Sequence, residues 1–122
     1  MPDTGAGSWL LPRLIGPSRA LRLLYSGAFL EAEEARQIGY VAELVAPEAL
    51  MDAARAEARR YLASSPFSLR HIKQLVWRGL ERDVGDHMAS HVEALQACFK
   101  SEDHKEGVAS FLERRPARFV GR

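Results

Sequence analysis

Hydrophobic positions along this chain recur every three or four residues, which is the spacing of one face of an α-helix. The pattern predicts helices over residues 8–14, 17–26, 31–38, 48–63 and 101–114. Two further helices after the Ser-Ser-Pro break at residues 64–66 are indicated by two apolar stripes: Leu69, Ile72, Val76 and Leu80, then Met88, Val92, Leu95 and Phe99. The chain is therefore predicted to be mainly helical.

The segment over residues 48–63 has a clear division between an apolar and a charged surface. Because its apolar residues form one stripe and charged residues occupy much of the remainder, we expect this helix to pack on one side. The stripe consists of Leu50, Ala54, Ala58, Tyr61 and Leu62.

One segment departs from the helical spacing. Residues 40–45 alternate apolar and β-prone side chains between Gly39 and Pro47, which predicts one short strand in an otherwise helical chain. An isolated strand leaves its backbone donors and acceptors unpaired, so this strand needs a partner. The alternative interpretation is an extended connector between helices, and the sequence leaves both open.

Length, charge and cysteine content narrow the class of protein. The 122 residues suffice for one domain with one core. With 17 basic and 16 acidic residues the net charge is +1, so no long-range field favours nucleic acid or an anionic membrane. Cys98 is the only cysteine, which excludes an internal disulfide, and no apolar run is long enough to span a bilayer. We expect a cytoplasmic protein that binds neither nucleic acid nor a membrane.

The N-terminal residues place a carboxylate beside a tight turn. Asp3 precedes Gly5 and Gly7, which permit backbone angles that are closed to other residues, and Ser8 suits the N-cap of the helix that follows. A carboxylate in this position can transfer protons in an active site. It can also cap the turn or helix, which is the interpretation that physical grounds alone favour.

Four segments in a fixed order resemble the crotonase superfamily and, more narrowly, the enoyl-CoA hydratase/isomerase family. They are PDTGAGSWLLPRLIG at residues 2–16, LYSG at 24–27, EEARQIGYV at 33–41 and EGVASFLERRPARF at 106–119. The resemblance implies the C-terminal helical part of a ClpP/crotonase-like α/β fold, without its N-terminal ββα spiral. Residues 1–122 then form a single C-terminal region, with helices and a strand flanking the active site over 1–45 and a helical assembly region over 46–122.

The resemblance also implies a reaction. Family members bind an acyl-CoA thioester, stabilise an enolate oxygen with two backbone N–H groups and move protons with carboxylates; coenzyme A enters as part of the substrate, and no separate cofactor is expected. Pro2-Asp3-Thr4-Gly5 matches the Pro-Asp-x-Gly motif whose aspartate is a catalytic acid or base in isomerase-like and phenylacetate-pathway-like branches. Both backbone donors and the two glutamates of hydratases belong to the upstream half of the family fold, so we expect this chain to be truncated.

Arginine and phenylalanine residues alternate near the C-terminus. By resemblance, Phe111 and Arg114 match family positions that contact the nucleotide end of coenzyme A, often from a neighbouring subunit. The ring would pack on the ligand and the cation would meet phosphate. The alternative is a solvated helix end, where basic residues interact favourably with the helix dipole. Both interpretations stay open.

Two histidines raise the question of a metal site. His87 and His91 are four residues apart, which places them on one face of a helix. However, His87 is not followed by the Glu of the zinc-protease motif, and Cys98 lies about 10 Å further along the helix than His91. We therefore predict no metal site.

Two functions remain from the sequence. The first is an enzyme of the enoyl-CoA hydratase/isomerase type that acts on unsaturated acyl-CoA thioesters through Asp3, with an oxyanion hole supplied by another segment or chain. The alternative is a noncatalytic remnant or an oligomerisation module, because this half of the family fold packs against neighbouring subunits. The expected partners are an acyl-CoA substrate and either further copies, in a trimer or hexamer, or a complementing N-terminal half.

Overall fold

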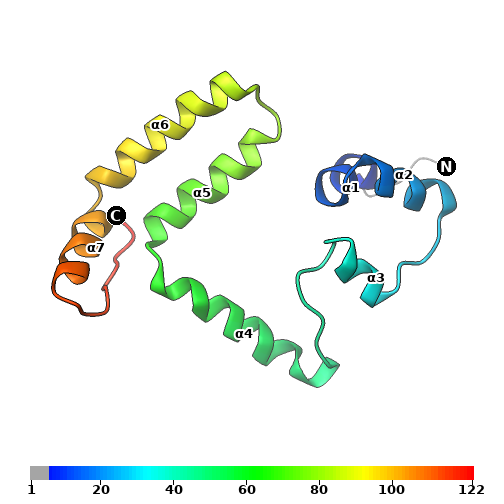
Figure 1. The fold of residues 1–122 in the computed structure, drawn as a ribbon, viewed down its shortest axis with the longest axis horizontal. Helices are drawn as coiled ribbons and strands as arrows, with labels where there is room; N and C mark the ends of the chain where they lie inside the picture. The colour runs from blue at the N-terminus through cyan, green and yellow to red at the C-terminus, as the bar shows by residue number, and fades with distance from the viewer. Residues whose placement is uncertain (1–5) are drawn as a thin grey trace. The chain divides into compact units, whose positions relative to one another are not determined.

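The computed structural model describes residues 6–122, and every regular element in that range is a helix (Figure 1). The predicted helices are present, with ends that differ by a few residues. The elements in chain order are α1 (Gly7–Ile15), α2 (Pro17–Ser26), α3 (Ala32–Gln37), the 3₁₀ turn η1 (Pro47–Ala49), α4 (Leu50–Arg60), the 3₁₀ turn η2 (Tyr61–Ala63), α5 (Pro66–Gly79), α6 (Val84–Lys100) and α7 (Glu102–Leu112).

The first of two compact units in the chain ends at Leu50. Within it, α1 and α2 pack against each other. Gly16 joins these two helices at a φ of 82°, a left-handed conformation that strains any residue with a side chain. Ile15 and Ala20 on either side of this joint are buried, as is Ala35 in α3. The glycine therefore allows the sharp change of direction that brings two short helices together.

The predicted strand over residues 40–45 is wrong. These residues adopt neither helix nor strand, and no strand occurs in residues 6–122. The N–H groups of Tyr40 and Val41 both donate to the Ala35 carbonyl, at 2.9 and 3.4 Å, so the start of the segment closes the end of α3. A strand requires a neighbouring strand for its hydrogen bonds, and the described residues supply none. The structure supports the alternative interpretation of a connector between helices.

The second unit begins at Met51, and its helices pack in chain order, α5 against α6 and α6 against α7. Each of these three helices begins at a polar residue that accepts a hydrogen bond from a backbone N–H in its first turn. Ser65 accepts at 3.1 Å, Asp83 at 2.8 Å and Ser101 at 3.0 Å. Such caps satisfy amides that have no partner within the helix, and so they define where the helices start.

The apolar stripes of the second unit are largely exposed. The prediction that residues 48–63 pack on one side is wrong for this chain by itself, because Leu50 is 58% and Leu62 79% exposed. In the described part of the chain, the buried apolar side chains all lie in the first unit. Extensive exposed apolar surface is typical of faces that contact other molecules. No helix over residues 6–122 has the length and apolar character to cross a membrane.

Candidate functional site

Asp3, the predicted proton-transfer residue, lies outside the described residues. The described part of its motif starts at Ala6, which has a left-handed φ of 58° and occupies the N-cap position of α1. Ser8 is thus the second residue of the helix and not its N-cap. The catalytic role of Asp3 stays a prediction.

Phe111 and Arg114 lie at the C-terminal end of α7. The Phe111 side chain is 82% exposed, and Arg114 follows the helix with a left-handed φ of 54°. The Arg114 N–H donates to the Phe111 carbonyl at 3.3 Å, which closes the helix end. Arg114 forms no ion pair with any residue in the range 6–122. An exposed ring beside an uncommitted guanidinium can contact an aromatic group and an anion together.

Phe111 also lines an apolar pocket of about 400 Å³ in the second unit. The pocket lies between α6, α7 and the C-terminal residues, and its apolar lining includes Phe99, Val108, Leu112 and Phe119. Phe119 approaches Gly107 closely enough that a β-carbon at that glycine would lie 3.7 Å from the ring. The residues after α7 therefore fold back along this helix and help to form the pocket.

Asp103 holds these C-terminal residues in place. Its carboxylate is almost completely buried, with 1% of the residue exposed. It accepts hydrogen bonds from the Ser65 hydroxyl at 2.6 Å, from the Val120 and Gly121 amides at 2.7 and 2.9 Å, and from the Phe67 amide at 3.4 Å. Burial acts to raise the pKa of Asp103, but the hydrogen bonds, led by that from Ser65, outweigh it and leave the pKa below its ordinary value.

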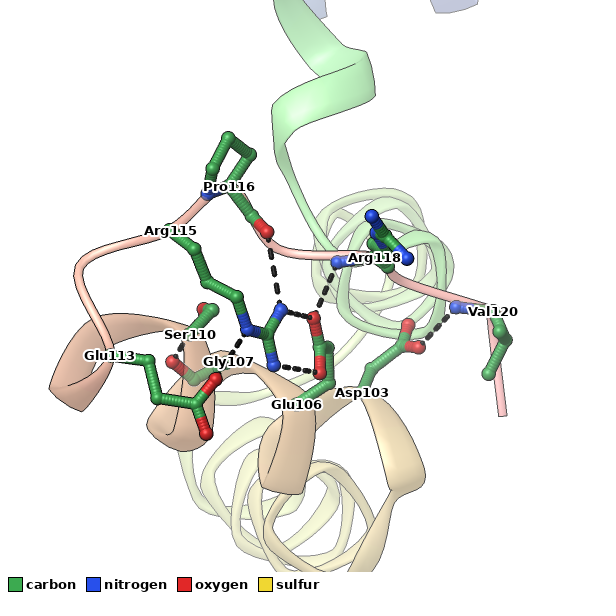
Figure 2. A network of polar contacts seen from close by, with 9 residues as sticks. All are labelled: Asp103, Glu106, Gly107, Ser110, Glu113, Arg115, Pro116, Arg118 and Val120. Carbon is green, nitrogen blue, oxygen red and sulfur yellow. Dashed lines mark hydrogen bonds and ion pairs between the residues drawn. The ribbon is translucent and has the colours of Figure 1, made fainter.

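Glu106 forms a second attachment one turn further along α7 (Figure 2). Its two oxygens accept from the Arg115 guanidinium at 2.5 and 2.9 Å, and one of them also accepts from the Arg118 amide at 2.6 Å. These contacts, chiefly the Arg115 hydrogen bonds, lower the pKa of Glu106 to about 2. Figure 2 shows that Arg115 also contacts Glu113 and the Pro116 carbonyl. The segment that carries Arg114 is thereby fixed to the helix that carries Phe111.

Sequence reasoning found neither the role of Asp103 nor the pairing of Glu106 with Arg115. Asp103 follows the Ser101 cap, so by itself it indicates an acidic first helical turn. Its hydrogen-bond partners lie up to 38 residues away in the sequence, and Arg115 lies nine residues from Glu106. A pattern of neighbouring residues in the sequence cannot indicate partners that lie so far along the chain. The glutamates and arginines at residues 106–118 were the available signal, and they resemble an ordinary charged surface.

The described residues contain no group of three or more His, Cys, Asp or Glu side chains that could hold a metal ion. His87 and His91 do lie on one helix, α6, and line an apolar pocket between α5 and α6.

This chain belongs to the enoyl-CoA hydratase/isomerase family, because the family model of that description matches residues 1–122. The family predicted from the ordered motifs is confirmed. The chain is 36% identical over 116 residues to crotonyl-CoA hydratase of Syntrophomonas wolfei, a match that covers 95% of this chain and 45% of the relative. It is 34% identical over 122 residues to 1,2-epoxyphenylacetyl-CoA isomerase of Escherichia coli, covering 100% of this chain and 46% of the relative.

Solved structures agree with this assignment. An enoyl-CoA hydratase subunit I from Geobacillus kaustophilus matches with a TM-score of 0.88 and 40% identity, over 100% of this chain and 47% of that one. An enoyl-CoA hydratase from Mycobacterium tuberculosis matches with a TM-score of 0.91 and 32% identity, over 98% and 47%. The helical fold is therefore similar to part of the enoyl-CoA hydratase fold, and the chain spans about half the length of the relatives it matches.

Proposed function

We propose that this chain belongs to an enzyme that acts on α,β-unsaturated acyl-CoA thioesters by stabilising an enolate and transferring protons through a carboxylate. The family match over all 122 residues carries this proposal. It is supported by relatives that are named for hydration of crotonyl-CoA and for isomerisation of 1,2-epoxyphenylacetyl-CoA. The two relatives are named for different reactions, but both named substrates are acyl groups attached to coenzyme A.

In this proposal Asp3 is the catalytic acid or base. A carboxylate that faces an apolar acyl group has a raised pKa, which suits proton transfer near neutral pH. The enolate oxygen requires preorganised N–H donors, and the loss of one such donor costs about 3–4 kcal/mol in a hydrolase. We assign both donors to a segment or chain that corresponds to the other half of the relatives.

The same proposal assigns the nucleotide end of coenzyme A to Phe111 and Arg114. The exposed ring and the uncommitted guanidinium support this role, since they offer a face for the adenine and a cation for a phosphate. The fixed turn at Arg114 supports it as well. Because Glu106 holds Arg115 and Arg118, which follow this turn, against α7, the Arg114 guanidinium extends from a fixed segment.

The decisive experiment measures turnover of crotonyl-CoA from the loss of its conjugated-thioester absorbance. The chain is assayed alone and after co-expression with the complementary half of the Syntrophomonas wolfei hydratase. We expect turnover from the complemented protein, and a loss of about 10²-fold or more in Asp3→Asn, because general acid or base catalysis contributes that much. Asp52→Asn, an exposed carboxylate on α4, is the matched control and should keep full turnover. Full turnover in Asp3→Asn would remove Asp3 as the catalyst.

Binding of coenzyme A to the chain is tested separately by calorimetry. Phe111→Ala and Arg114→Gln should each weaken binding, whereas Arg59→Gln, which removes an exposed charge on α4, should not. Equal affinity in all three variants would refute the assignment of the nucleotide end and would favour the solvated helix end.

The second candidate function is an oligomerisation module without turnover. The observation that favours it is the exposure of large apolar side chains, among them Tyr25 at 83%, Phe29 at 99% and Leu62 at 79%. Light scattering after size exclusion tests this candidate. A discrete trimer or hexamer that lacks turnover, even when complemented, would support it, and a stable monomer would exclude it.

A further inference from the structure

We infer that the groove between α5 and α6 binds a small phosphate-bearing anion. The two helices lie side by side in Figure 1 and pack against each other. The groove between them has a volume of about 390 Å³, which is large enough for a small ligand. It is lined by different residues from those assigned above to the acyl-CoA substrate.

The charges that line this groove are mainly positive. Arg78 and Arg82 line it together with His71 and His87, and Glu93 is the only acidic residue among the lining residues. Neither arginine forms an ion pair within residues 6–122. Even with both histidines neutral, the lining therefore carries a net positive charge that no neighbouring carboxylate pairs with.

The polar groups are also held in position. Arg82, in the turn between the helices, donates to the Ser90 hydroxyl on α6 at 2.6 Å, which ties its guanidinium across the groove while leaving its other N–H groups available. The His71 Nδ1 lies 2.9 Å from the Phe67 carbonyl, an acceptor, so a neutral ring carries its proton on Nδ1. Its other nitrogen then accepts a hydrogen bond from a protonated phosphate oxygen.

Gly79 explains how the His87 ring fits between the two helices. A β-carbon at this position would lie only 2.9 Å from the His87 Nδ1, closer than real β-carbons approach other atoms. The absence of a side chain on α5 therefore admits the imidazole from α6. The result is a pocket with two arginines and two imidazoles on fixed elements, which is the kind of preorganised surface that holds an anion without a large ordering cost.

The nearby acidic groups define which anion fits. The Asp83 carboxylate is engaged by the first amides of α6, at 2.8 and 3.1 Å, and so it is committed to capping. Glu93 also lies in the groove and offsets part of the positive charge, which leaves a net attraction that grows with the charge of the ligand. A doubly charged phosphate gains more from two guanidinium groups than a single carboxylate does, and its geometry matches their paired N–H donors.

The test titrates the 122-residue chain with inorganic pyrophosphate at fixed low ionic strength, using calorimetry and amide NMR shifts. We expect saturable binding to one site, with shifts centred on Arg78, His87 and Ser90. Arg78→Gln and Arg82→Gln should each weaken binding by about tenfold or more, because each removes a charge-assisted contact. Glu93→Gln should tighten binding severalfold, a gain that a merely structural residue would not produce.

A matched control locates the binding. Arg59→Gln removes an exposed arginine on α4 that forms no ion pair within residues 6–122, and it should leave the pyrophosphate affinity unchanged. An equal loss in this control, binding that does not saturate, or unchanged affinity in folded Arg78→Gln and Glu93→Gln would overturn the proposal. Adenosine monophosphate is titrated in parallel: the same variant pattern would identify a nucleotide phosphate, and binding of pyrophosphate alone would identify a free phosphate anion.

Discussion

Helices α4 and α7 each have 11 residues, but their side chains find partners over very different distances. Along α4 the charged residues pair with neighbours within the helix. Arg55 contacts Asp52 at 3.5 Å and Arg60 contacts Glu57 at 2.8 Å, each pair three residues apart and solvent-exposed. Such pairs support a helix wherever it lies, and they contribute only a few tenths of a kcal/mol each.

Glu102 on α7 also pairs within its helix, with Lys105 at 2.8 Å, but two other carboxylates of α7 reach other parts of the second unit. Asp103 joins the start of α5 to the last residues of the chain, and Glu106 binds the segment that carries Arg115 and Arg118. The two helices thus contain similar residue types with different consequences. On α4 a carboxylate modifies local helix stability, whereas Asp103 and Glu106 on α7 determine where the 10 C-terminal residues lie relative to the helices of the second unit.

The largest effect is expected from Asp103→Asn. The change replaces one acceptor oxygen by an NH₂ group, which then faces an N–H donor inside the unit. We expect the free energy of unfolding of the second unit to fall by about 2 kcal/mol, measured by urea denaturation. Hydrogen exchange at the Val120 and Gly121 amides should accelerate. Asp52→Asn is the control on α4 and should stay within about 0.5 kcal/mol; equal losses in both variants would refute the contrast between the helices.

A smaller effect at neutral pH is expected from Glu106→Gln. The amide keeps one acceptor for the Arg118 N–H but loses the paired contact with the Arg115 guanidinium. Exchange of the Arg118 amide should therefore accelerate, while the Val120 amide, which Asp103 holds, should change less. If both amides accelerate equally, the two attachments form a single cooperative unit and not two separate ones.

The stability of the folded chain is expected to fall at acidic pH as Glu106 becomes protonated. Because the folded-state pKa of Glu106 is about 2, below its ordinary value of 4.5, the folded state favours the ionised carboxylate. Its contribution is therefore fully present above about pH 4.5 and is lost as the pH falls toward 2. Asp103, whose pKa is also lowered, acts in the same direction. Urea midpoints measured from pH 6 to pH 2 should decline less steeply in Glu106→Gln than in the unmodified chain, and parallel profiles would contradict the assignment.

The smallest effect is expected from Glu57→Gln on α4. This change removes the exposed ion pair with Arg60 and weakens the contact with the Tyr61 hydroxyl, yet it leaves no buried group unsatisfied. The free energy of unfolding should change by less than about 0.5 kcal/mol. A loss as large as that in Asp103→Asn would show that the local pairs of α4 matter as much as the distant partners of α7.

Much of the helical fold could be predicted because its signals are local. The helix predicted over residues 17–26 is α2, and Gly27 occupies its C-cap with a left-handed φ of 60°. Residues 40–45 could not be assigned in the same way, because a strand exists only if a partner lies beside it. Phe111 and Arg114 are exposed, and they were singled out through the family motif alone.

The sequence by itself determined the family and the helical segments, since both depend on residues at short and regular spacing. Only the tertiary structure decided that Asp103 is buried among donors from the start of α5 and from the C-terminal residues, and that Arg82 reaches Ser90 across a positively lined groove. The physical reason is that a helix is specified within a few residues. The partner of a polar side chain depends on which distant segments the fold brings together.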